Sequence, residues 1–235
     1  MVSKRLDEVL QQFNEVFCEE LGMARTPSVH LKMKENSQPK FVPARPVLFA
    51  IKGAVAQEIQ HLESGRILKM VEFGLSSTVV PALKRDDSFR ICRDFKVTLN
   101  PALQIDQHPI PKLDAIFASQ ARGELFTTLD LSPAYQQLLL DDESSELVTV
   151  NTHLGLYCYS CLSFGVASAP AIFQWTIDQL LNGLTGMRCY LDDIIITRKS
   201  TEEHLNNLTP VLDQLQDKGF RPKEDKCHFL QSLVE

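Results

Sequence analysis

No apolar run in this chain of 235 residues reaches the roughly 18–20 residues that a membrane-spanning helix requires. The N-terminal residues 1–7 lack the apolar stretch of a secretory signal. The sequence therefore predicts an intracellular protein that makes no membrane contact.

Basic residues are too few to balance the acidic ones: 24 Lys and Arg stand against 30 Asp and Glu, which leaves a net charge of −6. Taken alone, this balance argues against a nucleic-acid-binding protein, because phosphate contacts usually require surplus Lys and Arg. The charges are unevenly distributed, however. Residues 84–96 carry five basic side chains, Lys84, Arg85, Arg90, Arg93 and Lys96, whereas residues 141–146 are strongly acidic. Carboxylates that hold metal ions would account for part of the acidic surplus.

A second CxxC pair is also missing. The six cysteines include one such pair, Cys158 and Cys161, but no second pair completes a zinc site. Alternation along a strand would place these two sulfurs on opposite faces. Four of the six cysteines lie in apolar stretches, where a reduced thiol behaves as a small hydrophobic side chain. We expect the cysteines to be reduced and structural.

The pattern of apolar residues predicts a mixture of helices and strands. Helical spacing and favourable helix starts indicate helices over residues 6–21, 50–68, 112–119, 169–181 and 201–218, the last capped by Ser200 and Thr201 with Glu203 as reciprocal partner. Alternation indicates strands over residues 29–33, 78–83, 88–92, 124–129, 147–151, 155–162, 187–191 and 194–197, with a hairpin tip at residues 84–87. This mixture implies an α+β fold, in which helices pack on one face of an antiparallel sheet.

Two adjacent acids, Asp192 and Asp193, stand between the apolar halves of a predicted hairpin, in the string Tyr190-Leu191-Asp192-Asp193-Ile194. The simpler interpretation is a turn, because Asp tolerates turn geometry and solvation. The pair lacks the Gly that favours a two-residue hairpin loop, however. A functional reason for the two acids therefore stays open beside the structural one.

A third acid, Asp130, stands where the strand over residues 124–129 gives way to a helical turn. Taken alone, it is more simply interpreted as a helix N-cap. The combination changes this balance, because a strand-end Asp and an Asp pair on a later hairpin can converge at one edge of a sheet. We therefore treat Asp130, Asp192 and Asp193 as a candidate group.

Nucleotidyl transfer would give three converging carboxylates a common task. Two Mg²⁺ ions roughly 3.5–4 Å apart activate the primer 3′-hydroxyl and stabilise the phosphate and the departing pyrophosphate. Mg²⁺ prefers a few carboxylates together with substrate phosphates and water. A set of Asp residues without His or Cys matches that preference, so we expect two Mg²⁺ ions, with Mn²⁺ as an alternative ion.

Several blocks of this sequence together resemble one family. Tyr190-Leu191-Asp192-Asp193 matches the Tyr-x-Asp-Asp box of reverse transcriptases, and with the block from Leu129 to Gln137 it resembles the polymerase of gypsy-type LTR retrotransposons. The other matching blocks are residues 90–96 (the end of the fingers hairpin), residues 162–174 (the template- and nucleotide-facing loop and helix), and residues 200–205 and 226–227 (the final helix and strands of the palm).

The resemblance implies a right-hand polymerase with fingers and palm and without a thumb. It places an N-terminal connection leading into the fingers at residues 1–45, the fingers at residues 46–120 and the palm at residues 121–235, with residues of about 140–170 also contributing to the fingers. It implies dNTPs and an RNA or DNA template with its primer as partners. It also implies a parent Pol polyprotein with further thumb, ribonuclease H and integrase domains, located in the cytoplasm or in a retrotransposon particle.

The resemblance assigns roles to single residues. Asp130, Asp192 and Asp193 would hold the metal ions, joined by the backbone carbonyl of Leu131. Tyr135 would lie under the incoming sugar and exclude a 2′-hydroxyl, which favours dNTPs over rNTPs.

A second group would bind the nucleotide. It comprises Lys84, Arg90, Ala134, Tyr135, Phe164 and Gly165. Lys84 and Arg90 would contact the triphosphate, where cationic groups offset developing charge. Phe164 and Gly165 would pack against the nucleotide and the template. Taken alone, the two cations are ordinary solvated charges of a hairpin, and Tyr135 is an ordinary core aromatic.

A function of a different class stays open. Pro133 has no N–H, whereas related polymerases hold the triphosphate through backbone N–H groups at this point. The alternative is a truncated, retrotransposon-derived protein that keeps the fold and nucleic-acid binding but no longer polymerises. The complete set of Asp130, Asp192 and Asp193 favours the enzyme, an RNA-directed DNA polymerase. The sequence makes no prediction about oligomeric state.

Overall fold

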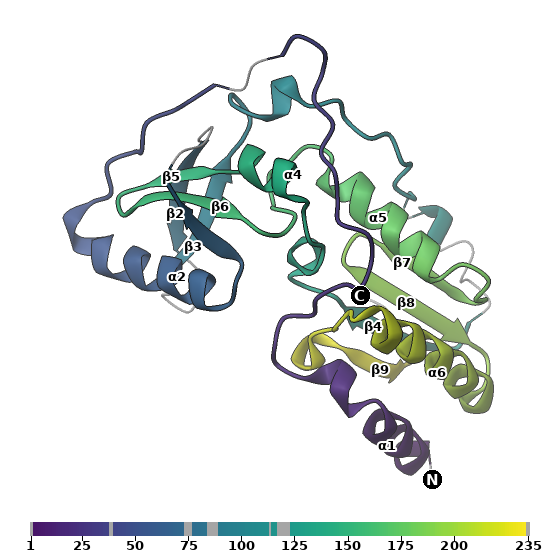
Figure 1. Cartoon of the computed structure of the whole chain (residues 1–235). Helices are drawn as coiled ribbons and strands as arrows, with labels where there is room; N and C mark the ends of the chain where they lie inside the picture. Colours follow the sequence, from purple (N-terminus) through teal and green to yellow (C-terminus); the bar gives the residue numbers. More distant parts are fainter. Residues whose placement is uncertain are drawn as a thin grey trace. The chain divides into compact units, whose positions relative to one another are not determined.

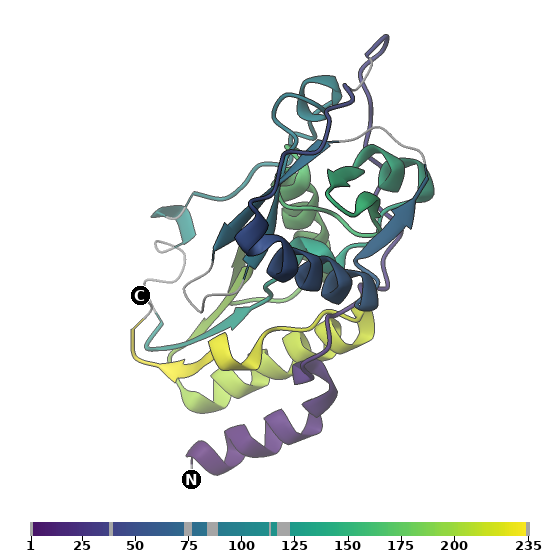
Figure 2. The same ribbon diagram turned by 90° about the vertical axis from the view of Figure 1, so that its left-hand side faces the viewer.

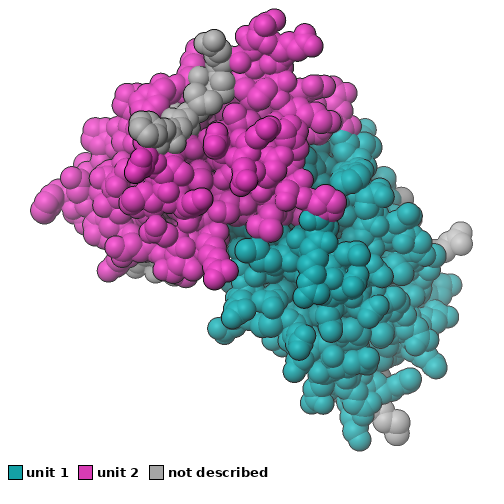
Figure 3. Space-filling model, in the orientation of Figure 1, with its two compact units in different colours: residues 1–26, 108–137, 170–235 teal, residues 27–107, 138–169 magenta. Residues whose placement is uncertain are grey.

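The structure is a computed structural model that describes residues 2–37, 40–72, 77–83, 89–112, 114–116 and 123–233. The chain divides into two compact units (Figure 3): unit 1 comprises residues 1–26, 108–137 and 170–235, and unit 2 comprises residues 27–107 and 138–169. Each unit is thus assembled from segments that are far apart in sequence. The fingers and palm ranges stated above remain a prediction.

Unit 1 is built on a four-stranded antiparallel sheet with strand order β7-β8-β4-β9. The strands are β4 (Leu125–Asp130), β7 (Met187–Tyr190), β8 (Asp193–Arg198) and β9 (His228–Gln231). β4 is an inner strand, with β8 along one edge and β9 along the other (Figure 1). The end of β4 and the β7–β8 turn therefore lie at the same edge of the sheet.

Unit 1 also contains helical elements. They include α1 (Val2–Gln12), η1 (Asn14–Phe17), η4 (Ala134–Gln137), α5 (Ala169–Leu180), α6 (Thr201–Lys218) and η5 (Glu224–Lys226). The prediction for α6 is confirmed at both ends: the Ser200 hydroxyl accepts a hydrogen bond from the Glu203 N–H at 3.3 Å, and the helix stops at Gly219 in the left-handed region. α1 lies alongside α6 (Figures 1 and 2).

The first predicted helix, over residues 6–21, is interrupted. α1 ends at Gln12, and a 3₁₀ turn follows in which the Val16 N–H donates to the Phe13 carbonyl at 2.9 Å. Phe13 and Val16 are both buried. Both side chains of the tighter turn thus belong to the core.

His204 is a fully buried histidine between α6 and β4. Its Nε2 lies 2.8 Å from the Thr127 hydroxyl of β4. Burial lowers the pKa of His204 below its usual range, and the positive charge of Arg198 acts in the same direction. The folded protein therefore favours the neutral imidazole.

We expect stability to fall as the pH drops from 7 toward 5. A group with a lowered pKa in the folded state contributes stability above its unfolded pKa of about 6.5, and this contribution is lost as the pH falls through the folded pKa. A His204→Gln variant should show a smaller drop in Tm over this range than the unmodified protein. The exposed His228 in β9 supplies the control. Equal pH slopes for His204→Gln and His228→Gln would contradict the assignment.

Unit 2 is built on a five-stranded sheet with strand order β1-β6-β5-β2-β3. The strands are β1 (Leu68–Val71), β2 (Ser77–Leu83), β3 (Phe89–Asp94), β5 (Val150–Thr152) and β6 (Gly155–Tyr159). Neighbouring strands are antiparallel except β2 and β5, which pair in parallel. The helical elements of this unit are η2 (Phe49–Ile51), α2 (Lys52–Ser64), η3 (Asn100–Ala102) and α4 (Asp142–Leu147).

Two predictions for unit 2 need correction. The helix predicted over residues 50–68 ends at Ser64, because Gly65 and the left-handed Arg66 (φ 58°) break it before β1 begins. The acidic residues 141–146 belong mostly to a short helix, α4, whose N-cap Asp141 accepts a hydrogen bond from the Ser144 N–H at 2.8 Å. The strand predicted over residues 147–151 is therefore shortened to β5.

The strand predicted over residues 29–33 is wrong. Val29 makes an isolated bridge to Leu140, and Met33 makes one to Leu103. Between them the Leu31 N–H donates to the Ser144 hydroxyl at 2.8 Å. Val29 and Leu31 meet residues 140–144, whereas Met33 meets Leu103, so a continuous ladder does not form. The alternating pattern reflected burial against several elements.

The prediction that the cysteines are reduced is confirmed: all six lie in described residues and are free thiols. Cys158 and Cys161 are buried, and burial raises the pKa of Cys161 to about 12. The predicted hairpin tip at residues 84–87 lies outside the described residues. So does half of the predicted helix over residues 112–119, namely residues 113 and 117–119, whereas residues 114–116 are helical. Across the described ranges, no helix is both long and apolar enough to cross a membrane. The α+β class is confirmed.

Candidate active site

Asp130 ends β4 and pairs in register with Asp193, the first residue of β8. One step further into the sheet the register partners are Leu129 and Ile194, both fully buried. Apolar residues thus anchor both strands, while the acids stand half-buried at the sheet edge. The Lys223 N–H donates to the Asp130 carbonyl at 2.7 Å and fixes the end of β4. The fold therefore brings two of the three candidate acids together.

The Asp130 carboxylate is held by two neighbouring residues. Its Oδ1 accepts hydrogen bonds from the Ser132 N–H at 2.7 Å and from the Ser132 hydroxyl. Its Oδ2 lies 3.5 Å from the Lys226 ammonium group, which also donates to the Ser132 hydroxyl at 2.7 Å. The lysine offsets part of the negative charge. Sequence reasoning gave Lys226 no such role, because the contact arises only when η5 folds back beside the end of β4.

The turn between β7 and β8 is supported by a side chain of α5. Leu191 adopts a left-handed backbone with φ 54°, which costs a residue other than Gly on the order of 1–3 kcal/mol. The fully buried Gln174 holds it there: its Oε1 accepts from the Leu191 N–H at 3.2 Å, and its Nε2 donates to the Cys189 carbonyl at 3.1 Å. The hairpin therefore does without the Gly that such turns favour.

Asp192 is tied to the segment that follows Asp130. The Leu131 N–H donates to the Asp192 carbonyl at 2.7 Å. Burial and the nearby carboxylates of Asp192 and Asp130 raise the pKa of Asp193 to about 6, although Lys226 opposes this shift. The three acids are thus close enough to repel one another, and a bound cation would relieve that repulsion.

The three acids are candidate ligands of a divalent metal ion. Within the described residues, no three His, Cys, Asp or Glu side chains converge closely enough to hold one ion. The ligand type nevertheless fits Mg²⁺, which prefers carboxylate oxygens, and the crowding of negative charge that raises the pKa of Asp193 fits a cation. In chemistry and charge the site therefore fits the ion.

Tyr135 lies in η4 and packs edge-on against Phe173 of α5, with ring centroids 5.6 Å apart. Burial raises the pKa of the Tyr135 phenol, and the negative charge of Asp192 raises it further. The phenol is therefore protonated near neutral pH and lies within electrostatic reach of the acids. Ala134 beside it is buried. The Leu131 carbonyl accepts from the Gln137 Nε2 at 2.6 Å, which leaves one lone pair for another partner.

The remaining predicted nucleotide contacts lie in unit 2. Arg90 is an exposed residue of β3. Phe164 is 42% exposed, and Gly165 after it has φ 94°, with the Arg93 carbonyl 3.2 Å from where a Cβ would lie. The Asn100 side chain holds this loop, donating to the Gly165 carbonyl at 2.9 Å and accepting from the Ala167 N–H at 2.9 Å.

The role of Asn100 in this loop emerges only from the fold. Lys84 lies outside the described residues.

Comparison with known proteins gives a consistent set of similarities. The family model described as "Reverse transcriptase (RNA-dependent DNA polymerase)" matches residues 83–235. An uncharacterized protein of Caenorhabditis elegans is 35% identical over 99% of this chain and 18% of its own length. The Pol polyproteins of the Drosophila melanogaster transposons opus and gypsy are each 30% identical, over 98% and 85% of the chain and 24% and 20% of their own lengths. The chain thus spans about a fifth of these relatives.

Solved structures show the same architecture. The foamy viral protease–reverse transcriptase in complex with an RNA/DNA hybrid matches 99% of this chain and 32% of its own, with a TM-score of 0.90 and 20% identity. A second structure of that protein, in complex with double-stranded DNA, matches 99% of this chain and 41% of its own with a TM-score of 0.89. At this identity the likeness concerns the fold alone, and it confirms the predicted fingers and palm architecture.

Proposed function

Because this chain belongs to the reverse transcriptase family of RNA-dependent DNA polymerases, we propose that it transfers dNTPs onto a primer under the direction of a template. The reaction would take place at Asp130, Asp192 and Asp193. The observation that carries this proposal is the register pairing of Asp130 with Asp193, beside the hydrogen bond from Leu131 to Asp192. Three acids at one sheet edge, in a chain of this family, would supply the ligands that nucleotidyl transfer needs.

Reverse transcriptases generally use divalent metal ions, and the proposal specifies two Mg²⁺ ions, with Mn²⁺ as an alternative. Asp130, Asp192, Asp193 and the Leu131 carbonyl would hold them. Such ions supply activation of the primer hydroxyl and neutralise charge on the phosphates. The protein's own part is to keep the ligands in place. Pairing of β4 with β8 holds Asp130 beside Asp193, and Gln174 holds the turn that carries Asp192.

Selection of the sugar is assigned to Tyr135. Phe173 of α5 packs edge-on against its ring. A 2′-hydroxyl would meet this ring, which favours dNTPs over rNTPs. Arg90 and Lys84 are proposed as contacts of the triphosphate, where positive charge offsets charge that develops in transfer. Ala134, Phe164 and Gly165 complete the proposed contacts with the nucleotide and template.

A primer paired with an RNA or DNA template is the proposed partner. Two observations support this choice: the foamy viral neighbours are complexes with double-stranded DNA and with an RNA/DNA hybrid, and the fold match covers 99% of the chain. Since the chain spans only 18–24% of relatives such as the opus and uncharacterized proteins, we place it within a longer Pol polyprotein.

The deciding test is extension of a DNA primer on an RNA template. We expect dNTP incorporation with Mg²⁺ or Mn²⁺, complete loss of incorporation in EDTA, and recovery when Mg²⁺ is restored. Binding of the same labelled primer–template is measured in parallel by fluorescence anisotropy. Folded protein that binds the duplex but incorporates nothing with either ion would refute the polymerase and support the non-polymerising binder described above.

A further inference from the structure

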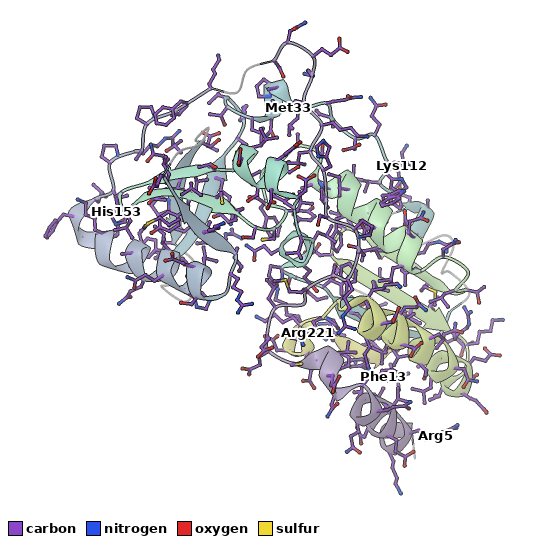
Figure 4. The ribbon with its side chains drawn as sticks, viewed as in Figure 1. Arg5, Phe13, Met33, Lys112, His153 and Arg221 are labelled. Carbon is purple, nitrogen blue, oxygen red and sulfur yellow. The ribbon has the colours of Figure 1, made fainter. Side chains whose placement is uncertain are left out.

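Gln137 is a fully buried polar side chain at the end of η4. Its Nε2 donates to the Leu131 carbonyl at 2.6 Å and to the Arg221 carbonyl at 3.0 Å, and its Oε1 accepts from the Arg221 N–H at 2.8 Å. Both hydrogens of the amide and one oxygen lone pair are thus satisfied by main-chain atoms. Arg221, labelled in Figure 4, follows the end of α6. The Gln137 side chain therefore links the segment after β4 to the turn after α6 through hydrogen bonds.

A third segment, which contains Gly22 and Ala24, also contacts Gln137. The Ala24 N–H donates to the main-chain carbonyl of Gln137 at 2.8 Å. Gly22 lies so close that an added Cβ would meet the Gln137 Oε1, with the Arg221 nitrogen at 2.8 Å and the Gly219 carbonyl oxygen at 2.9 Å. Two of these three atoms belong to the backbone and cannot swing aside. The N-terminal segment therefore confines the Gln137 amide to one position.

The Leu131 main chain lies between this amide and the acids. Its carbonyl accepts from Gln137, and its N–H donates to the Asp192 carbonyl at 2.7 Å. Leu131 also follows Asp130 directly in the chain, and its side chain is fully buried. A displacement of the Gln137 amide would therefore move the one residue that is bonded to Asp130 and hydrogen-bonded to Asp192.

We propose that Gln137 is a positioning residue of the carboxylate site, which sets the placement of Asp130 relative to Asp192 through the Leu131 main chain. The proposal rests on the proposed function for its meaning in catalysis, since Gln137 itself touches no reacting atom. It assigns the buried glutamine that ends the matching block from Leu129 to Gln137, to which the resemblance gave no role, to the alignment of the acids. Misplacement of reacting groups by about 1 Å costs roughly a hundredfold in rate, so small shifts of Leu131 would be measurable.

The first test replaces the amide by an apolar side chain of similar length, Gln137→Met. In the metal-free protein we expect NMR-detected hydrogen exchange at the Leu131 amide to accelerate at least about tenfold, because removal of the carbonyl anchor loosens its bond to Asp192. In primer extension we expect kcat to fall roughly tenfold or more, with the KM for dNTP within about twofold. Gln216→Met, an exposed position of α6, is the matched control and should change neither quantity.

A second variant leaves Gln137 intact and disturbs it from outside. In Gly22→Ala the new methyl group would press on the Gln137 amide, so faster exchange at Leu131 and a lower kcat are expected again. Gly53→Ala is its control, because nothing lies within 4 Å of a Cβ added there. The combined Gly22→Ala, Gln137→Met protein should lose less in kcat than the product of the two separate fold-losses, because both substitutions act through one contact.

The two readouts separate this proposal from the function on which it rests. If the unmodified protein extends primers while folded Gln137→Met protein keeps both its kcat and its slow Leu131 exchange, the positioning role is refuted and the polymerase stands. If the unmodified protein extends nothing, the polymerase fails, and the exchange rate at Leu131 in metal-free protein still decides the role of Gln137. A general loss of Tm that accelerates exchange equally across α6 and Leu131, with kcat retained, would indicate ordinary core packing and also refute it.

Discussion

Asp192→Asn is expected to abolish primer extension, with a loss of roughly a thousandfold or more. Asn keeps the size of the side chain and removes the negative charge, so one ligand of the proposed ions loses its charge. Stabilisation of the transition state by a bound metal ion amounts to several kcal/mol, and each 1.36 kcal/mol corresponds to about tenfold in rate. The measurement is single-nucleotide incorporation under saturating dNTP, with binding of the primer–template measured separately.

The same variant should not damage the fold. Asp192 is one of the charges that raise the pKa of Asp193, so its removal relieves repulsion, and the Tm without metal should be unchanged or slightly higher. Asp213→Asn, on an exposed position of α6, is the matched control and should extend primers normally. Undiminished extension by Asp192→Asn would exclude the hairpin acid from the reaction. The proposed site would then have to be abandoned.

Phe173→Ala is expected to cost unit 1 about 3–5 kcal/mol of unfolding free energy. Phe173 is fully buried on α5, and its ring lies between Tyr135 at 5.6 Å and Phe220 at 6.4 Å, centroid to centroid. Truncation would leave a cavity that these aromatic neighbours cannot fill by small shifts. Since a domain is typically stable by only 5–15 kcal/mol, the loss should appear as a large drop in the midpoint of urea unfolding.

Trp175, two residues along the same helix, supplies the control for this substitution. It is 53% exposed, so Trp175→Ala should cost well under half as much as the change at Phe173. A comparable loss of unfolding free energy for both variants would mean that both substitutions destabilise α5 as a whole. The buried ring of Phe173 would then make no particular contribution to stability. If Phe173→Ala folds stably, we also expect weaker discrimination against rNTPs, because Tyr135 loses the support of the ring behind it.

Local signals predicted unit 1 well. The β7–β8 hairpin, the strand before Asp130 and the capped helix α6 are each specified within one short stretch, by apolar alternation, helical spacing or a capping residue. The edge position of Asp130 and Asp193 followed from where their strands end. These are features in which local preference and tertiary structure agree.

The predictions that failed depend on contacts between distant segments. Residues 29–33 alternate like a strand, but their partners lie in two separate stretches, at residues 140–144 and at Leu103. The alternation therefore reflects burial and not pairing with one strand. The ion pair of Lys226 with Asp130 and the clamp of Gln137 on Leu131 have no signature in local sequence, because each partner looks ordinary until η4 and η5 are folded beside β4. The family resemblance assigned roles to the three acids, but it assigned none to the side chains that hold them.

The position of β4 within its sheet has a consequence for the order of folding during synthesis. β4 is complete when Asp130 leaves the ribosome, yet its partners β8 and β9 end only at Arg198 and Gln231. Both edges of β4 therefore remain unpaired until most of the remaining chain has been synthesised. Such long-range pairing slows folding and exposes strand edges to aggregation. Nascent chains of this protein should accordingly depend on chaperones until β9 has emerged.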